Sequence, residues 1–174
     1  VNIDEVKNLI KKIQNDKSSI CEIANDNAEG QVIISGDSKS IKKFQLFLKE
    51  KKIKSIPLKV SAPFHCSLMK PAAESMSEKI NNTNFTNPKF DIVCNVKALP
   101  ENDAKNIKSL LIDQIYNTVK WRESIINISE SGVTNFVEIG PGKTLTGMVK
   151  RTLTNVKSFS INSIADIKNL KNEF

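Results

Sequence analysis

Several residue types are scarce in this 174-residue chain, and each scarcity excludes a class of protein. No apolar run approaches the length of about 18 residues that a membrane-spanning helix needs, so we expect no membrane span. Three cysteines (Cys21, Cys66 and Cys94) lie far apart without a C-x-x-C spacing. This excludes a disulfide framework and a structural zinc site, and it fits a reducing cytoplasm. With two arginines, one tryptophan, one tyrosine and no ribonucleoprotein-type aromatic motif, the chain is not expected to bind nucleic acid.

Lysine supplies almost all of the positive charge, and the net charge is +7. The lysines are scattered, with small clusters such as "KEKKIK" at 49–54. They are either solvated faces or a surface that attracts an acidic partner or the phosphates of a ligand. The amino-terminal stretch has no signal-peptide apolar segment, and Val1 in place of Met leads us to expect a piece of a longer chain. Richness in Lys, Asn and Ile suggests an AT-rich bacterial genome.

Apolar periodicity predicts two groups of helices and strands, which we place in domains 1–60 and 61–174. The first group comprises a helix at 4–14, strands at 19–26 and 31–36, a helix at 37–51 and a strand at 53–60. That order is a ferredoxin-like βαββαβ unit whose first strand is missing. The second group comprises a helix at 71–80, a buried strand at 90–96, helices at 103–116 and 121–128, a strand at 134–140, a helix at 144–151, a strand at 156–161 and a helix at 163–171. Alternating strands and helices predict an α/β fold with a parallel sheet.

The only histidine, His65, lies in "VSAPFHCSLMKP" at 60–71. It is a packed core group, a metal ligand or a catalytic base. A metal site is not expected, because no second histidine exists and Cys66 would point elsewhere. A loop that follows a predicted strand favours a base. A Cys–His pair with Cys21 or Cys94 stays open, although both cysteines lie in apolar strand patterns, and no serine has the G-x-S-x-G frame. The residues thus offer a candidate base without a visible nucleophile.

A second candidate is "EIGPGKTLTG" at 138–147. It is not a P-loop, because Val137 stands where that motif needs its first glycine. The strand–Gly-Pro-Gly–helix turn is either a tight connection or a loop that lines a cleft and offers backbone N–H groups at a helix amino end.

Four segments resemble the malonyl-CoA:acyl carrier protein transacylases, in the order in which that family has them. They are "EIANDNAEGQVIISG" at 22–36, "VSAPFHCSLMKPAAESM" at 60–76, "DQIYNTVKWRESI" at 113–125 and "FVEIGPGKTLTGMVKR" at 136–151. Together they span nearly the whole chain.

The resemblance implies an α/β-hydrolase-like large subdomain with a ferredoxin-like small one. It implies transfer of a malonyl group from coenzyme A to the phosphopantetheine thiol of acyl carrier protein, in fatty acid biosynthesis, through an acyl-serine intermediate. His65 matches the histidine base, and Gln114 matches the glutamine whose backbone carbonyl accepts a hydrogen bond from the imidazole. Asn25 and Asn27 match asparagines near the acyl or pantetheine cleft, although both could be turn residues. No metal or other cofactor is implied, and a cytoplasmic monomer is expected for the full-length protein.

The chain departs from the family because it lacks the G-H-S-L-G elbow, the oxyanion-hole glutamine and the arginine that pairs with the malonyl carboxylate. We therefore expect a carboxyl-terminal portion that is inactive alone. Two other functions stay open: a non-catalytic module that docks acyl carrier protein through its lysines, and an acyltransferase of the polyketide type that accepts another acyl group.

Overall fold

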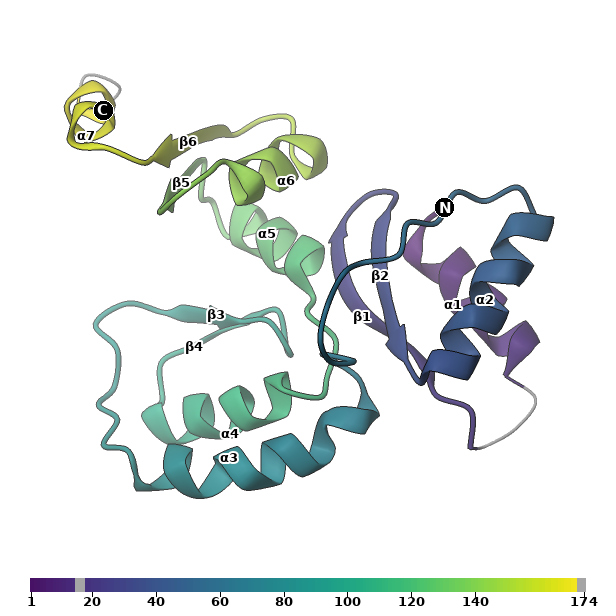
Figure 1. The fold of residues 1–174 in the computed structure, drawn as a ribbon. Helices are drawn as coiled ribbons and strands as arrows, with labels where there is room; N and C mark the ends of the chain where they lie inside the picture. Colours follow the sequence, from purple (N-terminus) through teal and green to yellow (C-terminus); the bar gives the residue numbers. More distant parts are fainter. Residues whose placement is uncertain (15–17, 172–174) are drawn as a thin grey trace.

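The computed structural model describes residues 1–14 and 18–171, and over these residues helices and strands alternate along the chain (Figure 1). The first four elements are α1 (Ile3–Ile13), β1 (Cys21–Ala28), β2 (Gln31–Gly36) and α2 (Ser38–Glu50). The two strands form an antiparallel hairpin, and both helices pack side by side against it. Each helix begins at a side-chain cap, because Asn2 accepts from the Glu5 backbone N–H and Asp37 accepts from that of Ser40.

The main core lies between this hairpin and its two helices. Apolar side chains recur at helical spacing in α1 and α2, so one face of each helix turns inward. The buried members are Val6, Leu9, Ile10, Ile13, Cys21, Phe44 and Leu48. This packing fixes β1, which carries several of the residues discussed below.

A second group follows the loop around His65. It comprises the 3₁₀ turn η1 (Ser67–Met69), α3 (Lys70–Asn82), β3 (Ile92–Cys94), β4 (Leu99–Glu101) and α4 (Ala104–Gln114). Helices α3 and α4 pack against each other, and α4 also contacts the antiparallel hairpin of β3 and β4. This arrangement places the carboxyl end of α4 beside the histidine loop.

The last group comprises α5 (Trp121–Glu130), β5 (Asn135–Ile139), α6 (Thr144–Thr152), β6 (Lys157–Ile161) and α7 (Ile164–Leu170). Strands β5 and β6 are parallel and α6 connects them, as the alternating pattern predicts. Helix α5 contacts β1, β3 and α6, and its Ile125 side chain is fully buried. It therefore packs against elements of all three groups.

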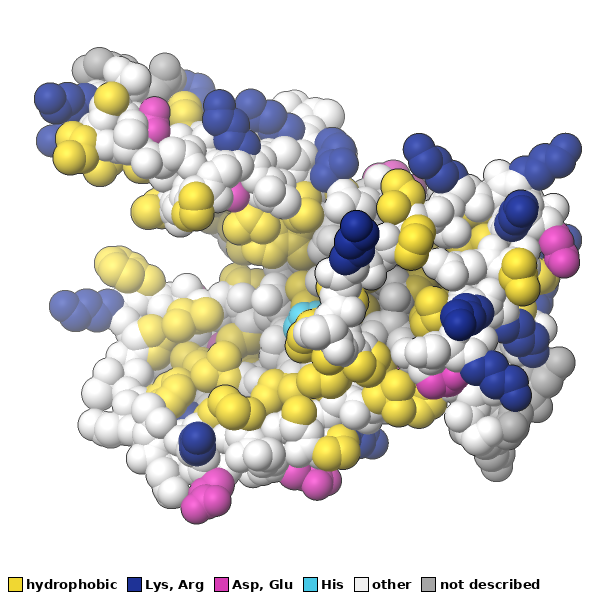
Figure 2. Space-filling model, viewed as in Figure 1, with side chains coloured by type: hydrophobic (Ala, Val, Ile, Leu, Met, Phe, Trp, Pro, Cys, Tyr) yellow, Lys and Arg dark blue, Asp and Glu magenta, His cyan; other side chains and the backbone are white. Residues whose placement is uncertain are grey.

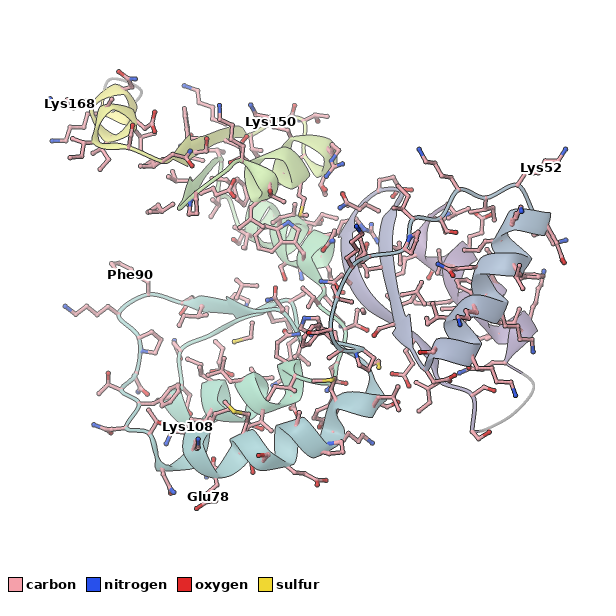
Figure 3. All side chains as sticks on the ribbon, viewed as in Figure 1. Lys52, Glu78, Phe90, Lys108, Lys150 and Lys168 are labelled. Atoms are coloured by element: carbon pink, nitrogen blue, oxygen red, sulfur yellow. The ribbon has the colours of Figure 1, made fainter. Side chains whose placement is uncertain are left out.

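Two predicted strands are wrong. Residues 53–60 run extended and almost wholly exposed, without strand pairing to any described residue, so the predicted strand does not form. The predicted buried strand at 90–96 is only the short β3, whose Ile92 is exposed, and Phe90 projects into solvent beside it (Figure 3). In both segments the apolar pattern is that of a strand, but a strand also needs a partner and a covering layer.

The surface of the chain is hollowed on one side. Figure 2 shows a deep notch between the part built by α3, α4, β3 and β4 and the part built by α5, β5 and α6, with hydrophobic side chains along its walls. Exposed apolar side chains of these strands include Leu99 and Ile139. Lysines such as Lys52, Lys150 and Lys168 project outward (Figure 3). Within the described residues, no helix is both long and apolar enough to span a membrane.

Candidate active site

His65 lies in the loop between the extended segment 53–60 and η1, and it is half-buried. Its φ of 58° puts the backbone in the left-handed region, which residues other than glycine rarely adopt. Cys66, the next residue, is fully buried, and its Sγ donates to the carbonyl oxygen of Pro63 at 3.1 Å. The fold thus imposes a particular backbone conformation at the histidine.

Nδ1 of His65 lies 2.9 Å from the backbone carbonyl oxygen of Gln114. Gln114 is the last residue of α4, and the final carbonyls of a helix have no partner within it, so this oxygen is available to the imidazole. Because a carbonyl oxygen only accepts, Nδ1 must carry the proton in the neutral ring, and Nε2 keeps its lone pair. The side-chain amide nitrogen of Gln114 is also 3.5 Å from Nδ1, a longer contact than that of the backbone carbonyl, and it donates to the Asn117 carbonyl at 3.3 Å. The arrangement can present Nε2 as a base.

The segment after Gln114 is joined to β1. The backbone N–H of Val119 donates to the Ala24 carbonyl at 2.8 Å, and that of Asp26 donates to the Val119 carbonyl at 2.9 Å. The hydroxyl of Thr118 donates to the Ile23 carbonyl at 2.6 Å. Strand β1 therefore holds the turn that carries the imidazole's partner.

Asn25 and Asn27 lie on β1, and both are half-buried. Two bulges, between Ile23 and Asn25 and between Asp26 and Ala28, shift the register of β1 around them and bend the strand. Neither asparagine side chain forms a hydrogen bond with any described residue, and this includes His65 and Gln114. The structure thus brings His65 and Gln114 together, while the Asn25 and Asn27 side chains lie on β1 and form no hydrogen bond with either of them.

A further contact, between Glu22 and Ser67, holds the chain just after His65, and the sequence analysis did not single out either residue. The carboxylate of Glu22 accepts from the backbone N–H of Ser67 at 2.8 Å and from its hydroxyl at 2.6 Å. A charged residue inside a strand pattern was the available signal in the sequence. This signal could not indicate the partner of Glu22, because Ser67 is 45 residues away in the sequence.

Asp26, between the two asparagines, is buried with 4 % of its surface exposed. Its carboxylate accepts hydrogen bonds from Nε of Arg122 at 3.0 Å and pairs with Nη2 at 2.8 Å. The hydrogen bond to Asp26 raises the pKa of the Arg122 guanidinium. This ion pair connects β1 to α5.

The Gly-Pro-Gly turn is a closed strand-to-helix connection. The Glu138 carboxylate accepts from the backbone N–H groups of Leu145 and Thr146 and from the Thr146 hydroxyl. These hydrogen bonds lower the pKa of Glu138, and the bond from the Thr146 hydroxyl has the largest effect. The Gly142 N–H donates to the side-chain oxygen of Asn162 at 2.6 Å. The N–H groups that the sequence offered to a ligand are therefore largely occupied by the chain itself.

The thiols do not form a pair with the imidazole. Cys21 is buried, and burial together with Asp37 and Glu22 raises the pKa of its thiol to about 11. Burial and Glu101 raise the pKa of Cys94. No hydrogen bond within the described part of the chain joins a cysteine side chain to His65. No group of three or more His, Cys, Asp or Glu side chains in that part could hold a metal ion.

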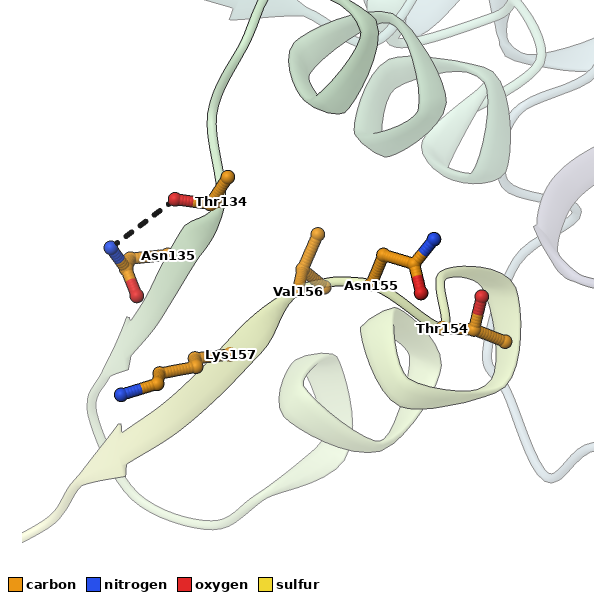
Figure 4. A pocket seen from close by; sticks show the side chains of 6 residues that line it. All are labelled: Thr134, Asn135, Thr154, Asn155, Val156 and Lys157. Atoms are coloured by element: carbon orange, nitrogen blue, oxygen red, sulfur yellow. Dashed lines mark hydrogen bonds between the residues drawn. The ribbon is translucent and has the colours of Figure 1, made fainter.

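A hollow of about 440 Å³ lies at the amino ends of β5 and β6, lined by Thr134, Asn135, Thr154, Asn155, Val156 and Lys157 (Figure 4). Ligand sites of parallel sheets lie at the opposite, carboxyl ends of the strands. None of the lining residues is hydrogen-bonded to His65 or Gln114. We therefore place the candidate site at His65.

Comparison with known proteins gives consistent relatives, although no protein-family model matches the chain. A malonyl CoA-acyl carrier protein transacylase of Staphylococcus aureus is 38% identical over 171 residues, which are 97% of this chain and 54% of the relative. The crystal structure of an acyl carrier protein S-malonyltransferase from Vibrio cholerae matches with a TM-score of 0.92 and 31% identity, over 98% of this chain and 55% of that one. A further match, with a TM-score of 0.91 and 34% identity over 99% of this chain and 56% of that one, is a structure of a type II PKS acyl-carrier protein in complex with its malonyl-transacylase. The chain spans about half the length of the curated relatives that it matches.

Proposed function

We propose that this chain, which belongs by sequence and fold to the malonyl CoA-acyl carrier protein transacylases, supplies the base of a malonyl transfer site. The observation that carries the proposal is the 2.9 Å contact between His65 Nδ1 and the Gln114 carbonyl. It fixes one ring nitrogen as a donor and leaves the other as a base. A neutral imidazole is suited to general-base work near pH 7.

The proposed reaction has two balanced halves. His65 Nε2 takes the proton of a serine hydroxyl while the serine oxygen attacks the malonyl thioester carbon. The bond to sulfur breaks, and the departing coenzyme A thiolate receives that proton. His65 then takes the proton of the acyl carrier protein's phosphopantetheine thiol, whose sulfur attacks the acyl-serine ester, and returns the proton to the serine oxygen. Serine needs such a base because its hydroxyl is a weak nucleophile at neutral pH.

The serine is assigned to the part of the relatives' length that this chain does not span, since no serine here has the elbow sequence. Asn25 and Asn27 are proposed to contact the acyl or pantetheine portion of the substrate. Their amides on β1, the same strand that holds the Gln114 turn, support that assignment. A cytoplasmic monomer and a domain boundary near residue 60 belong to the same proposal.

Activity is tested by grafting this sequence into the Staphylococcus aureus relative in place of its aligned half. We expect the hybrid to form a radiolabelled malonyl adduct and to pass it to acyl carrier protein. We expect His65→Ala to lower that rate by about 10²- to 10⁴-fold. Arg151→Ala is the matched control, because Arg151 is exposed and bonds only the Gln31 side chain. A folded hybrid that transfers nothing, or one indifferent to His65→Ala, would contradict the proposal.

The 174-residue chain on its own is expected to form no acyl adduct with malonyl-CoA. A stable acyl-serine on this chain would show that the nucleophile lies within it. On the hybrid, competition by acetyl-CoA and methylmalonyl-CoA separates a malonyl transferase from an enzyme of the polyketide type.

A second candidate function is docking of an acidic carrier protein without catalysis. A hollow of about 660 Å³ between α2 and the extended segment is lined by Lys42, Gln45, Leu46, Lys49, Ile53, Lys54, Ser55 and Pro57. Three lysines beside apolar lining residues match an acidic surface with apolar contacts. Salt-sensitive binding of acyl carrier protein to the 174-residue chain, lost in Lys49→Glu and Lys54→Glu, would favour this function if the hybrid shows no acyl adduct.

A further inference from the structure

The backbone at His65 is held in a conformation that is costly for a residue with a β-carbon. Its φ is 58°, and such a backbone persists only where its surroundings enforce it. Within the loop, the Phe64 N–H donates to the Ala62 carbonyl at 3.0 Å, and the Cys66 thiol donates to the Pro63 carbonyl. These two bonds lie at or before Cys66, and the bond from the Met69 N–H to the Cys66 carbonyl at 2.9 Å is local to η1, so only a contact from outside the loop can fix its position.

Glu22 provides that fixed point. Its two carboxylate oxygens receive the N–H and the hydroxyl of Ser67, so both oxygens bind the same residue. The Ser67 N–H is the first amide of η1, and the first amides of a helical turn have no partner within it. The Glu22 carboxylate thus satisfies an otherwise unpaired donor. Only Cys66 separates this contact from His65.

Three successive residues of β1 fix both partners of the imidazole contact. Glu22 holds the chain just after His65, while the carbonyls of Ile23 and Ala24 hold Thr118 and Val119 in the turn just after Gln114. The relative position of ring and carbonyl is therefore set by one short stretch of strand. The bulge that follows Ile23 lies within this stretch.

We propose that Glu22 and Ser67 are positioning residues that hold the His65 ring against the Gln114 carbonyl and so set which ring nitrogen is the base. The role of these residues in catalysis rests on the proposed function, but their effect on the orientation of the His65 ring does not depend on any substrate. Neither residue touches a reacting atom. Their effect reaches the reaction through the orientation of the imidazole.

The test uses the fact that His65 is the only histidine, so one imidazole gives the whole signal. The 174-residue chain is labelled with ¹⁵N-histidine, and the ratio of Nε2–H to Nδ1–H tautomers is measured by long-range ¹H–¹⁵N NMR at a pH where the ring is neutral. In the unmodified chain we expect the Nδ1–H tautomer to dominate. Glu22→Ala should raise the ratio about fivefold, which is the loss expected for one positioned hydrogen bond.

Ser67→Ala should raise the ratio in the same direction by a smaller factor, and Ser67→Thr, which keeps the hydroxyl, should restore it. The matched control is Glu138→Ala, which removes another carboxylate that accepts N–H and hydroxyl bonds, here at the start of α6. It should leave the tautomer ratio unchanged even though it destabilises the chain.

An unchanged ratio in folded Glu22→Ala and Ser67→Ala chains would overturn the proposal, and so would an equal change in Glu138→Ala. If Glu22→Ala does not fold, the Ser67→Ala and Ser67→Thr pair decides. Because the spectra need no substrate, failure of malonyl transfer in the hybrid and failure of this positioning give separate results.

Discussion

The Asp26 carboxylate on β1 and the Arg122 guanidinium on α5 form a two-point ion pair across 96 residues of chain. The carboxylate side chain is 6% exposed and the guanidinium side chain 25%, so both charges are largely withdrawn from water. A withdrawn charge is tolerated only with its partner in place. The ion pair therefore fixes the position of β1 relative to α5, and with it the position of the asparagines on either side of Asp26.

Removing one partner of this pair should be costly. We expect Arg122→Ala to lower the free energy of unfolding by about 3 kcal/mol, because it leaves the Asp26 carboxylate buried and unpaired. Urea denaturation measures the change, and exposed Arg151→Ala should cost less than about 1 kcal/mol. The double variant Asp26→Leu/Arg122→Met should recover part of the loss. A loss as large in the double variant as in Arg122→Ala would argue against an unpaired charge as the cause.

Two glycines should respond to alanine in opposite directions. A β-carbon on Gly36 would lie 2.0 Å from the backbone oxygen of Ile20, so Gly36→Ala should cost about 2–3 kcal/mol by forcing β1 and β2 apart. A β-carbon on Gly147, inside α6, meets nothing within 4 Å. Gly147→Ala should stabilise the chain by about 0.5–1 kcal/mol through helix propensity. Thermal unfolding of both variants gives the comparison, and a neutral Gly36→Ala would contradict the close approach.

Acid should weaken the cap of α2. Hydrogen bonds from the Ser40 hydroxyl, the Ser40 N–H and the Ile20 N–H lower the pKa of Asp37 from 3.8 to about 2. Because the folded pKa lies below the unfolded one, this stabilisation is complete above about pH 4 and is lost as the pH falls towards 2. We expect the urea midpoint to fall steeply over that window and less steeply in Asp37→Asn.

The remaining slope in Asp37→Asn is assigned to Glu138 and Asp166, whose pKa values are also lowered by hydrogen bonds. Asp4→Asn, at an exposed carboxylate of α1, should keep the steep fall of the unmodified chain. An identical fall in Asp37→Asn would show that the cap does not contribute.

The thiols should be slow to react in the folded chain. Burial raises the pKa of Cys21 to about 11 and raises that of Cys94, while Cys66 is wholly enclosed. Because the thiolate is the reactive form, a thiol reagent at pH 8 should modify Cys94 first and all three cysteines rapidly only in urea. A fast thiol whose reactivity disappears in His65→Ala would instead indicate a Cys–His pair.

The sequence predicted most helices within a residue or two, because their apolar spacing and caps are local properties. It failed at 53–60 and 90–96, where the pattern is that of a strand but the described chain offers no partner strand or only a short hairpin. The α/β class and the parallel β5–β6 pair follow from the order of elements, which is also local information.

Residue patterns predicted less of the candidate site than of the fold. His65 stood out because it is the only histidine, but its link to Gln114 came from the family resemblance and not from spacing. The Glu22–Ser67 and Asp26–Arg122 contacts join residues 45 and 96 positions apart. Such pairs depend on how β1 meets the histidine loop and α5, which no local pattern encodes. The catalytic and binding roles of His65, Gln114, Asn25 and Asn27 stay predictions.

The extended segment 53–60 also has a practical consequence for handling the chain. Ile56, Leu58 and Val60 are each more than half exposed, and no described strand pairs with their backbone. Exposed apolar side chains gathered on one short segment are a surface through which copies of the chain can associate. Samples at high concentration should therefore tend to self-associate, and dilute conditions or polar substitutions at these three positions should keep them dispersed.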